Sequence, residues 1–384
     1  MSVISDDEKD VKNRKAKKQP NDPLPPLVQG EGGLDVRPSP SISSAYVPDQ
    51  LVPRDLAFSS TLQGTPTNEM QRISLRTIAK ATVDRVTGKG EIKEGRITFS
   101  IADFIETSKN LRKNSPKKLF QYGVSQLTKI NPYKAVPPTS RADVRNEVQF
   151  SLTSYMEIRG LKDRKEAYRQ VREDCKTLLS ISAEWTEDWG KDSPRTFKMM
   201  NYVYKAELDN NGVITLAFTP DLAVYLVNEA FEMKLPDLFY RLDDKKNPNS
   251  SPLLFKLAVQ KRQTRGERTE DIHKITTLLD SATFIPPWQD ANIRRQAKAR
   301  IIKPLLRDLR ALAPLITSEL YDNMDALIPK DCEENIPFDA FLKSKIKVFW
   351  NEYPLPQHKN AAQEPYAKKK GGASHEKKRK KSLT

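Results

Sequence analysis

The sequence has few of the residues that metal centres and disulfide frameworks require. Its 384 residues include two cysteines and three histidines. Cys175 and Cys332 lie far apart with no Cys-x-x-Cys spacing, so neither a disulfide framework nor a structural zinc site is expected, and Cys175 is predicted to be a small buried hydrophobe. His273, His358 and His375 are isolated and form no His-x-His pair, which the metal site of a nicking enzyme would need. His273, at a predicted helix start, is expected to be a cap or a surface residue rather than a ligand.

Long apolar runs and phosphate-binding loops are also missing. No run approaches the roughly 18 apolar residues that span a bilayer, and the first residues, MSVISDDEKDVKNRK, lack the apolar core of a signal peptide. We therefore expect the protein to stay in the compartment where it is made. The Thr-Gly-Lys-Gly at 87–90 lacks the upstream glycine of a P-loop, and the glycines at 29–33 follow no predicted strand. The sequence predicts no enzyme activity, no cofactor and no metal.

Positive charge is the property in excess. Sixty-five Lys and Arg residues against 50 Asp and Glu give a formal net charge of +15. This balance favours polyanionic partners, chiefly nucleic acid or an anionic membrane surface. Part of the excess lies in a terminal stretch, where residues 368–370 and 377–381 are almost entirely Lys and Arg. Such a tail raises non-specific affinity for nucleic acid without specifying a sequence.

Composition and periodicity divide the chain into arms and folded parts. Residues 1–70 are rich in Pro, Ser, Asp and Lys without a sustained apolar period, which predicts a disordered arm. Residues 71–95 are interpreted as a linker, and residues 359–384 as a disordered basic tail. Two folded domains are expected between them, at 96–235 and 236–358.

The elements predicted for the first domain follow the order of a winged helix. A short β run and a helix are expected at 97–108, and a second helix at 117–130. A strand at 148–150, a helix at 152–158 capped by Ser151, a turn at Gly160 and a helix at 163–180 come next. Tyr202, Tyr204, Ala206 and Leu208 then alternate with polar positions, and the Asp-Asn-Asn-Gly turn at 209–212 leads into a returning strand with Ile214, Leu216 and Phe218.

The helix at 163–180 has its charges sorted by face. At about 100° per residue, Lys165, Arg169, Arg172 and Lys176 stack on one side, and Ala167, Val171, Cys175 and Leu178 stack on the other. Asp163, Glu166 and Asp174 are predicted to lie off the basic side, with Glu173 at its border. A helix with a basic front and an apolar back, presented by a turn after another helix, is typical of a DNA-reading element.

The second domain repeats this order. A helix is expected at 251–263, a short helix at 274–281 and a long basic helix at 291–312. Because Pro304 removes a backbone hydrogen bond, that long helix is predicted to kink at Lys303–Pro304. A strand at 345–351 has residues 315–322 as its candidate partner.

Three segments together resemble the winged-helix replication initiator (Rep) proteins of bacterial theta-replicating plasmids. SLTSYMEIRGLKDRKEAYRQ is similar to the first helix-turn-helix of that family, and LPDLFYRLDDKKNPNSSPLLFKLAVQ to the start of its second domain. ARIIKPLLRDLRAL is similar to its second recognition helix, which also has an internal proline. The resemblance covers roughly 95–355, while the long arm and residues 96–147 are not part of the common core.

The resemblance implies an α+β, predominantly helical fold of two tandem winged-helix domains with disordered N- and C-terminal tails. It also implies a cytoplasmic, DNA-associated bacterial protein that binds direct repeats (iterons) in double-stranded origin DNA, helps to open it, and recruits host helicase or initiator proteins. Homodimers of such proteins often repress their own promoter. No membrane partner is expected.

The predicted DNA contacts divide between the two domains. Lys165, Arg169 and Arg172 are expected in one major groove, with Lys162, Arg164 and Lys176 nearer to phosphates. Arg294, Arg295 and Lys298 are expected in the next groove, and Lys303 completes the set. Two alternatives stay open: a winged-helix transcriptional regulator that binds inverted sites, and a partition or scaffold protein whose basic tail coats DNA.

Overall fold

The computed structural model describes the chain from Phe58 to Tyr353, with gaps. The described residues are 58–62, 70–94, 97–131, 144–187, 196–227, 232–264, 270–351 and 353. All of them belong to one compact body, Leu51–Thr384. Residues 1–57 of the expected arm and the expected tail at 359–384 lie outside the described residues. Among the helices that are described, none is both long and apolar enough to cross a membrane.

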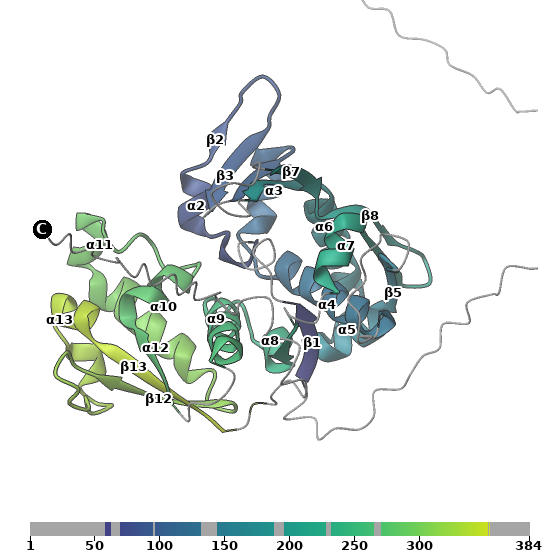
Figure 1. The fold of residues 1–384 in the computed structure, drawn as a ribbon. Helices are drawn as coiled ribbons and strands as arrows, with labels where there is room; N and C mark the ends of the chain where they lie inside the picture. The colour runs from purple at the N-terminus through teal and green to yellow at the C-terminus, as the bar shows by residue number, and fades with distance from the viewer. Residues whose placement is uncertain are drawn as a thin grey trace, which may run out of the picture. The chain divides into compact units, whose positions relative to one another are not determined.

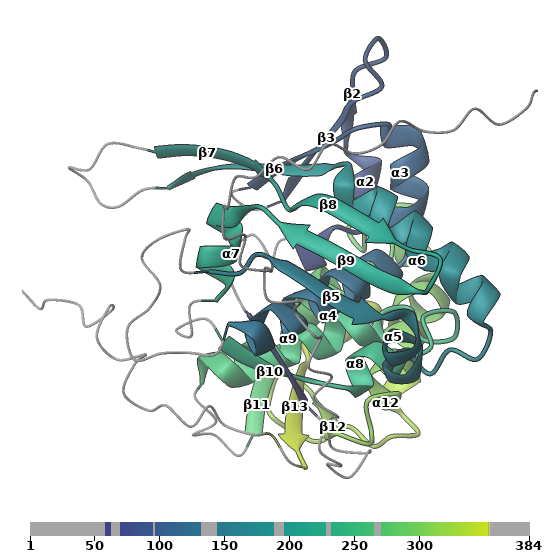
Figure 2. The same ribbon diagram turned by 90° about the vertical axis from the view of Figure 1, so that its right-hand side faces the viewer.

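A small antiparallel sheet and three helices form the part of the molecule that includes the two-faced helix. The strands, in the order in which they pair, are β5 (Glu147–Ser151), β9 (Val213–Phe218) and β8 (Val203–Leu208). The helices are α4 (Ser115–Ile130), α5 (Leu152–Arg159) and α6 (Arg164–Leu179). Figure 2 shows the three strands side by side. We call these six elements the first unit; their chain order is helix, strand, helix, helix, strand, strand.

Local sequence signals explain where α5 and α6 begin and end. The Ser151 hydroxyl accepts a hydrogen bond of 2.9 Å from the Ser154 amide, so it caps α5 as the sequence predicted. Gly160 ends α5 in the left-handed region at φ 65°, which glycine adopts without steric cost. The Asp163 carboxylate then accepts bonds from the amides of Lys165 and Glu166, which begins α6.

The hairpin β8–β9 confirms the predicted strands but not every inward residue. Tyr202 is buried, whereas Tyr204, expected on the same face, is 51% exposed. The pairing with β9 shifts register between Val203 and Lys205, so strict alternation fails at this point.

A second set of elements repeats the same order, and we call it the second unit. Its strands pair in the order β11 (Glu270–Lys274), β13 (Lys345–Trp350) and β12 (Ile316–Tyr321). Its helices are α9 (Ser250–Gln263), α10 (Ile275–Ser281) and a final helical stretch of α11 (Ala291–Arg295), η3 (Lys298–Ile302) and α12 (Lys303–Arg310). In both units the first strand pairs with the third, and the third with the second. Figure 1 shows β12 beside β13, and Figure 2 shows β9 between β5 and β8. The candidate pairing of 345–351 with 315–322 is confirmed.

The single long helix expected at 291–312 is wrong. The helical path is interrupted at Gln296, and residues 298–302 form a π-helical turn in which the Lys303 amide donates to the Lys298 carbonyl. Pro304 follows in the first turn of α12, where a backbone N–H is not needed. The wider π turn therefore accommodates the proline at the boundary where the sequence predicted a kink.

The expected linker is folded. Residues 71–95 contribute α2 (Leu75–Ala79), β2 (Thr82–Val83) and β3 (Gly90–Glu94). These strands belong to a five-stranded antiparallel sheet, β2-β3-β4-β6-β7, which also contains β4 (Ile97–Ile101), β6 (Ile181–Glu187) and β7 (Thr196–Asn201). Helix α3 (Phe104–Leu111) follows β4.

Part of the expected arm is folded too, because β1 (Phe58–Leu62) pairs with β10 (Glu232–Pro236). Short helices α7 (Pro220–Leu226) and α8 (Leu238–Arg241) complete the first half of the chain.

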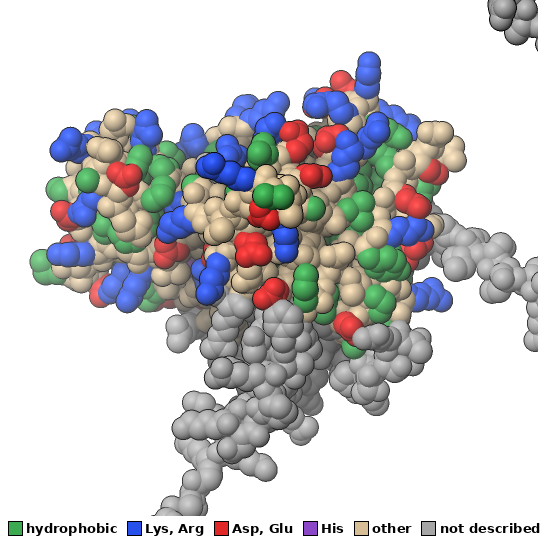
Figure 3. Space-filling view, turned by 90° about the horizontal axis from the view of Figure 1, so that it is seen from above, with side chains coloured by type: hydrophobic (Ala, Val, Ile, Leu, Met, Phe, Trp, Pro, Cys, Tyr) green, Lys and Arg blue, Asp and Glu red, His purple; other side chains and the backbone are tan. Residues whose placement is uncertain are grey.

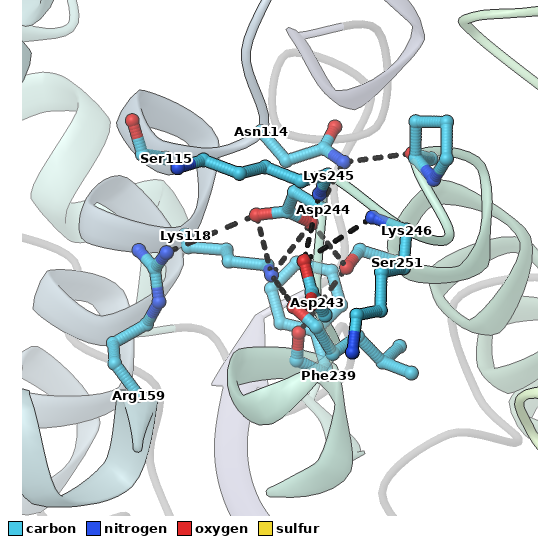
Figure 4. A network of polar contacts seen from close by, with 12 residues as sticks. Asn114, Ser115, Lys118, Arg159, Phe239, Asp243, Asp244, Lys245, Lys246 and Ser251 are labelled. Atoms are coloured by element: carbon cyan, nitrogen blue, oxygen red, sulfur yellow. Dashed lines mark hydrogen bonds and ion pairs between the residues drawn. The ribbon is translucent and has the colours of Figure 1, made fainter. Parts of the chain in front are cut away.

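A buried polar network ties α4 to the segment before α9 (Figure 4). Lys118 is fully buried, and its ammonium group donates to both Asp244 carboxylate oxygens at 2.8 Å and to the Leu242 carbonyl at 2.9 Å. The Asn114 amide donates to the same carboxylate and to the Pro248 carbonyl. Burial lowers the pKa of Lys118 to about 8, although Asp244 opposes that shift. A buried charge of this kind is costly to leave without its partner, so the network fixes the two segments against each other.

Two expectations about isolated residues have different outcomes. Cys175 is buried as predicted, and burial raises the pKa of its thiol to about 12. The prediction for His273 is wrong, because it lies within β11 and is 2% exposed. Burial lowers the pKa of His273 to about 4, so the imidazole is neutral at pH 7.

Candidate nucleic-acid interface

The ten residues predicted to contact DNA are all exposed. In the first unit, Lys162 lies in the turn before α6, Arg164 is the first residue of that helix, and Lys165, Arg169, Arg172 and Lys176 lie along it. In the second unit, Arg294 and Arg295 lie in α11, Lys298 in η3, and Lys303 begins α12. The structure therefore groups nine of them on the third helical stretch of each unit, with Lys162 in the turn that leads into the first of these stretches.

The outward surface of α6 carries both free and paired cations. Arg169 forms an ion pair of 2.6 Å with Glu166, and Lys176 one of 3.0 Å with Glu173. The prediction that Glu166 lies off the basic side is therefore wrong, because it reaches the central arginine three residues later. The hydrogen bond from Arg169 lowers the pKa of Glu166, which keeps that carboxylate charged. Lys165 and Arg172 have no such carboxylate among the described residues.

Buried groups hold α6 in place from behind. Asp174 is fully buried, and its carboxylate accepts hydrogen bonds from the Ser115 hydroxyl at 2.8 Å and the Asn110 amide at 3.1 Å. Ser115 is the first residue of α4 and Asn110 lies in α3, so the carboxylate joins three helices. Burial raises the pKa of Asp174 to about 6. The sequence argument placed Asp174 away from the basic side, which is confirmed, but missed this role.

The hairpin after α6 is held close to the helix-turn-helix. Gly212 has φ 84°, and its carbonyl accepts a 2.7 Å bond from the Leu152 amide. A Cβ at this position would lie 3.2 Å from Nη2 of Arg164. The tip of the hairpin therefore lies beside the start of α6, as a wing does in a winged helix, and it needs glycine for its backbone conformation.

The cations of the second unit are mostly engaged by one acidic segment. This segment comprises η4 (Glu333–Asn335) and α13 (Phe338–Lys343), between β12 and β13. The contacts from the helical stretch are Arg294 to Asp339, Lys298 to Asn335 at 2.7 Å, Lys303 to Glu334 at 3.6 Å, and Arg310 to Glu333 at 2.8 Å. Arg294 also lies over the Phe338 ring, 5.7 Å from its centre. Of the predicted contacts in this unit, only Arg295 has no partner among the described residues.

The second unit holds its helical stretch by an equivalent buried aspartate. Asp308 in α12 is fully buried, and its carboxylate accepts bonds of 2.9 and 2.8 Å from the amide and the side chain of Asn249. The Ser250 hydroxyl donates to the Asp308 carbonyl at 2.7 Å. The Asn249 side-chain oxygen accepts a bond from the Phe284 amide at 2.8 Å, so it also fixes the turn after α10.

A short sequence repeat underlies the two aspartate contacts. Residues 114–120 (NSPKKLF) and 249–255 (NSSPLLF) share Asn-Ser-x-x-x-Leu-Phe, and each Asn precedes the first helix of its unit. In both cases the residues that begin this helix bind an aspartate in the third helical stretch. The contacting positions differ by one: Ser115 donates to the Asp174 carboxylate, whereas Asn249, which corresponds to Asn114, donates to the Asp308 carboxylate. This signal was present in the sequence and could have been found by comparing the two predicted first helices.

The molecular surface agrees with this picture of separate cations. On the face shown in Figure 3, Lys and Arg side chains are spread among Asp and Glu side chains rather than merged into one continuous basic patch. Within the described residues, no group of three or more His, Cys, Asp or Glu side chains is arranged to hold a metal ion.

The match to a family model covers the first unit. Residues 102–232 match the model described as "Initiator Replication protein, WH1". The expected resemblance to winged-helix replication initiators is thereby confirmed for this segment. A comparison with curated protein sequences finds no match.

Superpositions on solved structures are loose. Two crystal structures of domains 2 and 3 of RctB align with TM-scores of 0.38 and 0.36, at 13% and 12% identity, over 75% and 74% of this chain and 98% and 96% of theirs. The WH1 domain of MSBI1.176, a replication protein isolated from a multiple sclerosis patient, aligns with a TM-score of 0.23 at 14% identity, over 32% of this chain and 88% of that domain. At these TM-scores the assignment rests on the family model and on the order of elements, not on the superpositions.

Proposed function

We propose that this chain is a sequence-specific initiator that binds double-stranded origin DNA through two tandem winged helices, because residues 102–232 match the family model described as "Initiator Replication protein, WH1". The tandem arrangement is supported by the shared strand order of the two sheets and by the repeated Asn-Ser start of α4 and α9. The family implies that the DNA sites are direct repeats in a plasmid origin.

The observation that carries the proposal is the outward surface of α6. Lys165 and Arg172 are exposed and have no carboxylate partner among the described residues, and the helix that presents them is fixed from behind by Asp174. A rigid helix with free cations after a helix and a turn fits the major groove, where arginine and lysine pair with guanine. Lys162 and Arg164, at the start of the helix, are placed for phosphates, and so is Lys176 once its exposed pair with Glu173 opens.

The proposed role is positional and involves no chemistry on the DNA. Binding at several adjacent repeats would concentrate the protein at the origin, where binding energy could favour opening of AT-rich duplex. Recruitment of a host helicase or initiator protein, and dimers that repress the protein's own promoter, are what the family implies for this chain. The proposal places the protein in the bacterial cytoplasm with its DNA and assigns it no membrane partner.

Footprinting of the full chain on the DNA that flanks its own coding sequence tests this function. We expect protection that recurs as direct repeats. Protection of a single inverted repeat would instead favour a winged-helix transcriptional regulator. Uniform coating of every duplex, lost when residues 359–384 are deleted, would favour a scaffold or partition protein, and either result would overturn the initiator proposal.

A further inference from the structure

Apart from Ala291, and from Arg307, which donates to the Asp308 carboxylate at 2.8 Å, the exposed side chains of the third helical stretch of the second unit divide into two groups. Ile293, Ala297 and Ile301 face the core and are excluded from both. The first group is the set that contacts the acidic segment, described above: Arg294, Lys298, Lys303 and Arg310. The second group has no side-chain hydrogen bond or ion pair with any described residue; its members are Asn292, Arg295, Gln296, Ala299 and Arg300. We call these the paired group and the open group.

The paired group is poorly placed for DNA. Each side chain is directed along the protein surface toward η4 or α13, and three of the four contacts are with carboxylates, which cancel the charge that would attract a phosphate. Breaking an exposed ion pair costs little, about 1 kcal/mol or less, but the acidic segment would then lie beside the DNA with its carboxylates uncompensated. These residues are better explained as the attachment of that segment.

The open group has the chemistry of base recognition. Arginine binds guanine through two hydrogen bonds, asparagine and glutamine bind adenine in the same way, and a small apolar side chain tolerates the thymine methyl group. Arg295, Gln296 and Asn292 supply these groups, and Ala299 leaves room for close approach between them and Arg300.

The irregular backbone keeps the open group together. The amides of Ala299 and Arg300 both donate to the Gln296 carbonyl, at 3.1 and 2.9 Å, so the chain continues to turn past the break at Gln296. In the π turn at 298–302, which follows, Arg300 is exposed while Ile301 and Ile302 are buried. A regular helix with the same sequence would place these residues differently.

We propose that the second unit reads base edges of double-stranded DNA through Asn292, Arg295, Gln296 and Arg300, whereas Arg294, Lys298 and Lys303 hold the acidic segment and do not read DNA. The inference rests on the proposed function and deepens it, because it names the residues that would discriminate sequence. It also replaces three of the four contacts that sequence periodicity suggested for this unit.

Two double variants of the full chain, matched in helix and in charge removed, test the assignment. Binding is measured at fixed salt to a duplex that covers the protected repeat and to a duplex of scrambled sequence with the same base composition. Arg295→Ala with Arg300→Ala should reduce the preference for the repeat about 10- to 100-fold, because bidentate base contacts are lost. Arg294→Ala with Lys298→Ala should leave that preference within about twofold of wild type.

A conservative variant separates base reading from charge. Arg295→Lys keeps the positive charge but loses the bidentate fork, so it should lose preference while its dependence on salt stays the same. Circular dichroism and binding to the scrambled duplex report whether each variant is folded.

The results separate failure of the proposed function from failure of the residue assignment in the second unit. If wild-type protein shows no preference for any duplex, the proposed function fails. If wild-type protein prefers the repeat and Arg295→Ala with Arg300→Ala keeps that preference, the function stands and this assignment is wrong. Loss of preference in Arg294→Ala with Lys298→Ala alone would also overturn it.

Discussion

The third helical stretches of the two units have similar charge and different surroundings. Both are fixed from behind by a buried aspartate that binds the start of the first helix of its own unit, Asp174 in α6 and Asp308 in α12. In the first unit the insertion before the wing, β6–β7, joins the five-stranded sheet and leaves the cations of α6 exposed. In the second unit the acidic segment, which lies between β12 and β13, packs beside the helical stretch and pairs with its cations.

The difference shows that a basic helix face is an ambiguous signal. Lysine and arginine on the surface of a helix can bind DNA or can attach a neighbouring acidic segment, and the two roles give the same periodicity. Whether a carboxylate lies opposite decides between them. Variants at the buried aspartate contacts of α6 and α12, and on the outward surfaces of these helices, test whether the two differ as described.

Loss of a contact to Asp308, which holds α12, should destabilise the protein more than loss of a contact to Asp174, which holds α6. Asn249→Ala removes a hydrogen bond to the buried Asp308 carboxylate and leaves the Phe284 amide without its acceptor, which should lower the free energy of unfolding by about 3 kcal/mol. Ser115→Ala removes the hydrogen bond from the Ser115 hydroxyl to the Asp174 carboxylate, keeps the bond from Asn110, and should cost about 1.5 kcal/mol. Chemical denaturation of the full chain measures both. Equal effects below 1 kcal/mol would show that the two supports are not the anchors described above.

The contribution of Asp174, which holds α6, to the free energy of unfolding should depend on pH. The pKa of Asp174 is raised from 3.8 to about 6 in the folded protein, so the folded state holds this proton at pH values where the unfolded chain has released it. The free energy of unfolding should therefore fall as pH rises from 4 to 6, by about 3 kcal/mol, and be level above pH 6 as far as this group is concerned.

The variant Asp174→Asn cannot titrate and isolates this contribution. The difference in unfolding free energy between wild type and variant should change across pH 4–6 and be constant above it. A difference that is constant over the whole range would mean that the folded carboxyl titrates normally.

Removal of a carboxylate from the outward surface of α6 should change DNA affinity only slightly. Glu166→Gln removes the carboxylate that pairs with Arg169 and should raise affinity for duplex DNA about two- to fivefold at low salt. Glu334→Gln makes the same change opposite Lys303 and Arg310, whose side chains are directed toward the acidic segment, and should leave affinity unchanged. Fluorescence anisotropy with both variants compares the two surfaces directly. A gain in affinity with Glu334→Gln alone would reverse the assignment of the two faces.

Elements with a strong local signal could be predicted from the sequence. The Ser151 side chain can cap a helix and Gly160 can adopt a positive φ, so both ends of α5 could be predicted. The apolar side of α6 has a clear helical period. The 3₁₀ and π segments and the short strands at 58–62, 82–83 and 90–94 could not be predicted, because two to five residues are too few for a periodicity to stand out. Their pairing is decided by partners distant in the sequence, such as β1 with β10.

The candidate site was predictable in location and only partly in detail. All ten predicted cations are exposed, and nine of them lie on the third helical stretch of a unit, with Lys162 in the turn before α6. Periodicity could not show that Arg169 reaches Glu166 or that Arg294 reaches Asp339, which is 45 residues away. The open group was missed because neutral Asn and Gln side chains do not contribute to a charge pattern.

The double variant Lys165→Ala with Arg172→Ala tests whether the unpaired cations on α6 bind the duplex. The control is Lys330→Ala with Lys343→Ala, which removes the same charge from exposed positions of the second unit. Affinity for the duplex that carries the protected repeat is measured at fixed salt, with circular dichroism to confirm folding. We expect the α6 variant to lose at least about tenfold in affinity and the control to stay within about twofold of wild type. Unchanged affinity in the α6 variant, or an equal loss in the control, would contradict this expectation.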